Sequence, residues 1–144
     1  AAARDALGSG ATVGPLNSAA NYFAVATNVL DARIAQAKGD RKAAIASWTK
    51  AVVAEDALNY DEPATWYYPV RESLGAALLA DGQAAEAERV FREDLARHAR
   101  SGRSLYGLVA ALQAQQKAAD AAWAEAQFEA AWKDADTKVR LEDM

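Results

Sequence analysis

The sequence predicts an all-α protein of about three antiparallel helix pairs. Apolar residues recur with helical spacing from Asn21 onward, with almost no alternation of the strand type. A pattern of a turn glycine, a small residue and a large ring also returns along the chain. Alanine, the commonest residue, favours helix but buries little area. The core therefore depends on close helix contacts, and the rings expected to fill it are Trp48, Trp66, Phe91, Trp123, Phe128 and Trp132.

The chain divides into a short arm and one helical domain. Residues 1–20, "AAARDALGSGATVGPLNSAA", contain three Gly and one Pro and little apolar periodicity. We expect them to form a mobile N-terminal arm. Residues 21–144 are expected to form the repeat domain.

Two segments share the same offsets from a turn glycine. Ala44 and Trp48 follow Gly39 by the same distances at which Ala87 and Phe91 follow Gly82. A third segment, "AQQKAADAAW", aligns Gln116 with Gly82 and Ala121 with Ala87. Because two helices approach closely only at a small residue, Gly75 is expected to face Ala87. The Phe91 ring would then close the gap to the next pair, which contains Gly107.

The combination Leu74-Gly75-x-x-Leu78 with Ala87-x-x-x-Phe91 resembles the tetratricopeptide repeat, whose period is about 34 residues. The resemblance covers roughly residues 21–133 and implies a solenoid that binds other proteins. It is weaker at several positions, where Ala32, Arg71, Ala99 and Glu125 replace residues usual in the family. More narrowly, the stretches "REDLARHARSGRSLYGL" and "WAEAQFEAAW" resemble the C-terminal part of large bacterial tetratricopeptide-repeat proteins of unassigned role.

A long connector separates the first two repeats. Gly39 and Gly82 lie about nine residues further apart than one repeat requires, and the surplus falls in "ALNYDEPAT". In one interpretation the rings fold this loop onto the helices, with Arg71 held by Asp61 or Glu62. In the other, residues 55–68 form a partner-binding surface, because clustered aromatic and Arg residues are typical of binding hot spots. The candidate binding residues are Tyr60, Asp61, Glu62, Trp66, Tyr67 and Arg71.

No catalytic, metal or cofactor site is predicted. The single His98 lies among arginines near an expected helix C-terminus, where cations complement the helix dipole. The sequence offers it no clear nucleophile or orienting partner. Glu55, Asp56, Asp61 and Glu62 lack EF-hand spacing and are expected to be a solvated acidic patch. The chain has no Cys, which excludes thiolate metal sites and leaves both a cytoplasmic and a periplasmic location open.

Charge distribution limits the class of partner. The chain carries a net charge of −4, and residues 55–62 hold acids without any base. Neither nucleic acid nor an anionic membrane is an expected partner, since both require basic surfaces. Of the inner-face positions counted from the repeat pattern, only Arg33 could contribute to a clamp for a peptide carboxylate. We therefore expect a non-catalytic scaffold that binds a protein, a peptide or the rest of a longer array. The alternative is a scaffold segment of a larger enzyme or ligand-binding protein.

Overall fold

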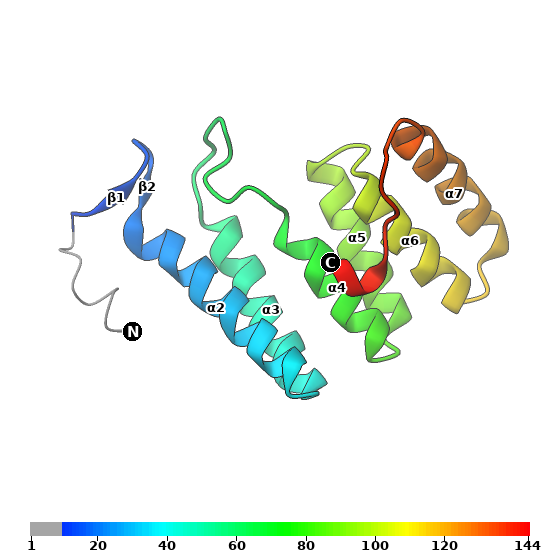
Figure 1. Ribbon diagram of the computed structural model, residues 1–144, viewed down its shortest axis with the longest axis horizontal. Coiled ribbons are helices and arrows are strands. Elements are labelled where there is room, and N and C mark those ends of the chain that lie inside the picture. Colours follow the sequence, from blue (N-terminus) through cyan, green and yellow to red (C-terminus); the bar gives the residue numbers. More distant parts are fainter. Residues whose placement is uncertain (1–9) are drawn as a thin grey trace. The chain divides into compact units, whose positions relative to one another are not determined.

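The computed structural model describes residues 10–144 and confirms that this part of the chain is mainly α-helical (Figure 1). It forms two compact units, one ending at Val70 and the next beginning at Arg71. None of the described helices is both long enough and apolar enough to cross a bilayer. The elements of the first unit are β1 (Thr12–Val13), β2 (Asn17–Ser18), α2 (Ala19–Ala37) and α3 (Arg41–Asp56). Those of the second are α4 (Val70–Ala80, which starts at the last residue of the first unit), α5 (Ala84–Arg97), α6 (Gly102–Ala114), α7 (Ala118–Trp132) and the 3-10 helix η1 (Leu141–Asp143).

A short hairpin precedes α2 where the sequence suggested a mobile arm. Thr12 pairs with Ser18 and Val13 with Asn17 in an antiparallel register. The Ser18 side chain then caps α2 by accepting the Asn21 N–H at 3.2 Å. Residues 1–9 of the expected arm lie outside the described residues. Residues 10–20 instead carry the hairpin and the first residues of α2, because the Gly14–Pro15 turn reverses the chain.

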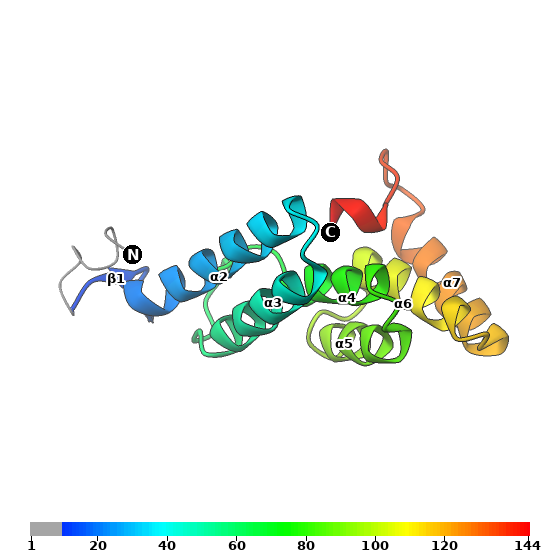
Figure 2. The same ribbon diagram turned by 90° about the horizontal axis from the view of Figure 1, so that it is seen from below.

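In the first unit, α2 packs against α3 (Figure 2). Trp48 is completely buried, as its position in the repeat pattern predicts. The Arg33 guanidinium lies 4.9 Å from the centre of the Trp48 ring, in a cation–π contact. Arg33, the one cation expected on the inner face, is thus already engaged with its own unit.

The same backbone turn ends three helices. Gly39, Gly82 and Gln116 all adopt a left-handed conformation, with φ of 74°, 79° and 60°. At each turn two hydrogen bonds close on the preceding helix in the Schellman pattern; at the first, the N–H of Asp40 donates to the carbonyl of Ala35. The structure therefore confirms the predicted turn positions, including the alignment of Gln116 with Gly82. The small residue five positions later is buried in each case (Ala44, Ala87 and Ala121).

In the second unit, the fully buried Phe91 ring lies between two glycines. A Cβ atom at Gly75 of α4 would lie 2.4 Å from the ring, and one at Gly107 of α6 only 2.1 Å away. The predicted wedge role of Phe91 is therefore confirmed. The three atoms nearest to a Cβ at Gly75 all belong to Phe91, and the expected facing of Gly75 and Ala87 stays a prediction.

The rings expected in the core are buried to different degrees. Trp48 and Phe91 are fully buried, whereas Trp66, Phe128 and Trp132 are only partly covered. Trp123 is 60% exposed, so its assignment to the core is wrong. α7 buries only Ala121 and Ala124 fully, and Trp123 lies beside them in sequence but outside the buried face.

Candidate functional site

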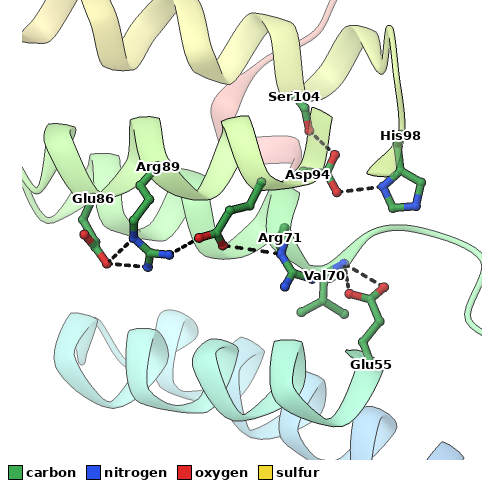
Figure 3. A network of polar contacts seen from close by, with 9 residues as sticks. Glu55, Val70, Arg71, Glu86, Arg89, Asp94, His98 and Ser104 are labelled. Atoms are coloured by element: carbon green, nitrogen blue, oxygen red, sulfur yellow. Dashed lines mark hydrogen bonds and ion pairs between the residues drawn. The ribbon is translucent and has the colours of Figure 1, made fainter. Parts of the chain in front are cut away.

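The two ends of the connector are tied together by a helix cap. The Glu55 carboxylate, in the last turn of α3, accepts the backbone N–H of Val70 at 3.1 and 3.2 Å (Figure 3). Val70 is the first residue of α4, and its backbone N–H therefore has no partner within the helix. Pro69 directly precedes it and has no N–H to satisfy. The connector thus runs from Ala57 to Pro69, slightly shorter than the predicted 55–68 at its start.

A pair of asparagines attaches the hairpin to the connector. The Asn59 N–H donates to Oδ1 of the fully buried Asn17 at 2.7 Å, and Asn17 Nδ2 donates to the Asn59 carbonyl at 3.1 Å. Asn17 Nδ2 also donates to Oγ1 of Thr65 at 2.9 Å, and Asn59 Nδ2 donates to the Leu16 carbonyl at 2.7 Å. The connector is therefore bonded to the hairpin by contacts that span more than 40 residues of sequence.

The aromatic residues of the connector divide into two groups. Trp66 packs on Tyr22 of α2 and on Tyr68, with ring centres 5.5 and 5.9 Å apart. By contrast, the side chains of Tyr60 and Tyr67 are 79% and 86% exposed. Of the sequence-predicted residues, Trp66 thus braces the loop on α2, while Tyr60 and Tyr67 face solvent.

A cleft of about 350 Å³ lies between the hairpin turn and the connector. Its lining combines two acids with mostly apolar residues: Val13, Gly14, Pro15, Asp61, Glu62, Pro63, Ala64 and Thr65. No Lys or Arg occurs in residues 10–32 or 51–70, so the described sequence around the cleft carries no basic residue. The cleft therefore suits the aliphatic stem and charged head of a basic side chain.

Local hydrogen bonds fix the two cleft carboxylates. Oδ1 of Asp61 accepts the Glu62 N–H at 3.0 Å, and the Thr65 hydroxyl donates to Oδ2 of Asp61 at 3.5 Å. The Tyr60 hydroxyl donates to the Glu62 carboxylate, and this hydrogen bond raises the pKa of Tyr60. Asp61 and Glu62 thus enter the cleft already oriented, and Tyr60 is tied to its rim.

Gly14 brings the hairpin turn against Asp61. Its φ of 64° is left-handed, and a Cβ atom there would lie 3.1 Å from Oδ2 of Asp61. A glycine therefore satisfies both the conformation of the turn and the close approach of the carboxylate.

Arg71 belongs to the second unit, where its Nε lies 3.8 Å from Glu93. Figure 3 shows it at the end of a charged chain in which Arg89 joins Glu93 to Glu86. The expected pairing of Arg71 with Asp61 or Glu62 would link the two units, and it stays a prediction.

His98 is connected to a buried acid rather than to a nucleophile. Its Nδ1 lies 2.9 Å from Oδ1 of the fully buried Asp94, and the Ser104 hydroxyl donates to the other oxygen at 2.5 Å (Figure 3). In a catalytic triad the imidazole lies between the hydroxyl and the acid. Here the acid lies in the middle, so these contacts join the end of α5 to the start of α6 without activating Ser104.

Within residues 10–144, no three His, Cys, Asp or Glu side chains come together as a metal-binding group. Among the acids considered for a hard cation, Glu55 caps α4 and only Asp61 and Glu62 line the cleft.

The sequence reading missed Asn17, Asn59 and Thr65. A signal for the hairpin was present, since "TVGPLNS" places a Gly-Pro turn between short polar and apolar flanks. Nothing local indicates that Asn17 bonds to a residue 42 positions away.

Comparisons with models of known families, with curated proteins and with solved structures give no match to this chain.

Proposed function

We propose that this protein is a non-catalytic, tetratricopeptide-like interaction module that binds a basic segment of a partner protein at the cleft between the hairpin and the connector. The observation that carries the proposal is the orientation of Asp61 and Glu62 in a cleft whose surrounding sequence holds no basic residue. Two exposed tyrosines flank the cleft-lining segment in sequence. Such rings add contact area at low cost in conformational entropy.

The repeat character is supported by turn geometry and spacing. The second and third Schellman turns lie 34 residues apart, from Gly82 to Gln116, and both precede a buried alanine at the same offset. A period of this length is typical of tetratricopeptide repeats. The first turn is set apart by the extra residues of the connector, which favours a special role for that loop because long ordered loops are often functional.

Braced and exposed parts of the connector have separate tasks in this proposal. Trp66, Asn17 and Asn59 hold the loop, while Tyr60, Asp61, Glu62 and Tyr67 meet the partner. Arg71 is assigned to the fold of the second unit through Glu93. This division combines the two interpretations that the sequence left open.

The test is a binding titration with defined peptides. Fluorescein-labelled nonapeptides containing Lys and Arg among Pro and Ala would be titrated with the full chain by anisotropy, beside equivalents in which each base is Glu. The basic peptides should bind, and raising the salt concentration should weaken them because exposed charges are screened. Equal binding of the acidic set would contradict the proposal.

Variants localise the binding. Asp61→Asn with Glu62→Gln should reduce affinity about tenfold or more, and Tyr67→Ala should reduce it less, with thermal unfolding little changed. The matched control is Asp120→Asn with Glu129→Gln, which removes the same charge from exposed positions of α7. A similar loss in the control would assign the binding to net charge instead of to the cleft.

A further inference from the structure

A segment after α7 returns to the start of α6. The Trp132 indole N–H donates to the Thr137 carbonyl at 2.8 Å, which bends the chain directly after the helix. The same ring lies against Gly102, where a Cβ atom would be 2.2 Å from the indole. Figures 1 and 2 both place η1 beside α4 after this reversal. We call residues 138–144 the strap.

The strap is held by one guanidinium that binds its backbone. Nη2 of Arg103 donates to the Asp143 carbonyl at 2.9 Å. The next residue, Met144, has a relative exposure of only 2%. Arg140 pairs with the Asp143 carboxylate at 2.7 and 2.9 Å, which stiffens η1 internally. A carbonyl contact followed by a buried apolar side chain is how a short peptide is commonly held.

Arg103 is positioned by Glu72, a buried acid of α4. Its Nε donates to Glu72 at 2.6 Å, and the Ser101 hydroxyl donates to the other Glu72 oxygen at 3.0 Å. Burial raises the pKa of Glu72, while Arg103 and Ser101 act in the opposite direction. The donor that meets the strap thus belongs to a polar cluster whose other members, Glu72 and Ser101, lie outside the strap.

The chain between Trp132 and the Asp143–Met144 end of the strap is largely exposed to solvent. Residues 133–138 are all exposed, and Leu141 and Val139 are only partly buried. Ordering such a segment costs conformational entropy, which its contacts must offset. This combination suits a segment that leaves its surface more easily than a core helix does.

We propose that Glu72, Ser101 and Arg103 form a peptide-docking surface that the strap occupies in cis, and that a partner segment of the same chemistry replaces it there. The fitting segment presents a backbone carbonyl to Arg103 and follows it with a long, unbranched apolar side chain. This surface is distinct from the acidic cleft of the first unit, and neither proposal depends on the other.

The probe is a peptide of residues 138–144, capped at both ends and labelled with fluorescein. Its affinity would be measured by anisotropy for the full chain, for Met144→Asp and for the exposed control Glu142→Gln. A carboxylate at position 144 is too costly to bury without a partner and should release the strap. The wild-type chain and the control should bind the probe at least tenfold more weakly than Met144→Asp, because their own strap competes at millimolar effective concentration.

Adding Arg103→Ala to Met144→Asp should abolish probe binding. Equal affinity of the probe for Met144→Asp and for the wild-type chain, with helical circular dichroism intact, would overturn the proposal.

A second measurement covers the case in which Met144→Asp unfolds. A protease site placed at 134–136 in the otherwise unchanged full chain would be cut after folding, and exchange of the released strap with labelled probe would be followed. Exchange within minutes is expected. Retention of the fragment for hours would make the strap a fixed part of the fold, and light scattering that revealed strap-exchanged dimers would place a second copy on the surface instead.

Discussion

At the scale of single residues, Phe91 shows how this alanine-rich chain obtains a well-packed core. Its ring occupies space that only glycine leaves at positions 75 and 107. Gly75→Ala should therefore lower the free energy of unfolding by about 1–3 kcal/mol through overpacking. Thermal and urea unfolding would measure the change.

A double-mutant cycle provides the control for this overpacking. In the background of Phe91→Ala, the added methyl group at position 75 meets no ring, so Gly75→Ala should cost much less there. An equal cost in both backgrounds would show that helix propensity or backbone strain, and not the ring, sets the effect.

Glu88 gives a second residue-scale prediction, this time in pH. The hydrogen bond from Lys117 is the main reason that the pKa of Glu88 falls to about 2, with Arg92 and Gln115 acting in the same direction and burial opposing them. A carboxyl group with a depressed folded-state pKa stabilises the fold above its unfolded value near 4.5. That contribution is lost as the pH falls toward 2.

Glu88→Gln should accordingly reduce stability at pH 7 by about 1 kcal/mol after allowance for solvent screening. The difference from the wild-type chain should shrink between pH 5 and pH 2. Urea unfolding at several pH values measures it, and a difference that stays constant down to pH 2 would contradict the assigned ion pair.

At the scale of elements, the connector depends on a hairpin that lies far from it in sequence. Asn17→Ala removes the acceptor of the Asn59 N–H and the donor to Thr65. Asn59 is exposed and Thr65 is partly exposed, so water can reach both groups, and the loss should cost about 0.5–1.5 kcal/mol for each hydrogen bond. The connector should also become more susceptible to limited proteolysis between residues 57 and 69.

Asn21→Ala is the matched control, because the Asn21 side chain is exposed and only its backbone N–H bonds to Ser18. Its cleavage rate should match that of the wild-type chain. Equal protection of the connector in Asn17→Ala would mean that the rings alone hold the loop.

Regular elements were predictable from local pattern, whereas the attachments were not. The offsets from Gly39 and Gly82 to a small residue and a ring can be read from the sequence, because they reflect how successive helices pack. The turn at Gln116 has the same left-handed conformation without a glycine. Gln at a left-handed position is uncommon, so only the alignment of the repeats indicated it. The Asn17–Asn59 contacts depend on the folded chain, and no local propensity encodes them.

Ion pairing and burial likewise depend on how the helices pack. Charge pattern suggested Arg71 as a partner of the connector acids, and that pairing stays a prediction; within the second unit, Glu93 supplies a carboxylate 3.8 Å from the Arg71 Nε. Trp123 was expected to share an apolar face of the last helix with Phe128 and Trp132, yet α7 buries Ala121 and Ala124 and leaves the Trp123 ring 60% exposed. Residue type predicted which groups were available, and only the packing of the helices decided which became buried.

At the scale of the whole molecule, the proposed interaction module has two surfaces of opposite character. The cleft of the first unit presents carboxylates to a basic partner. Arg103 of the second unit presents a guanidinium to a peptide carbonyl. Because each surface is built within its own unit, a change at one should leave binding at the other intact.

Hydrogen exchange on the full chain, with and without the tightest-binding basic peptide, tests the role of the connector most directly. In the free chain the amides of Asn59 and Val70 should be protected, since they donate to Asn17 and Glu55. Saturation with the peptide should then slow exchange across residues 60–68. Exchange of residues 55–68 that stays unchanged at saturation would show that the peptide binds elsewhere and would contradict the proposed site.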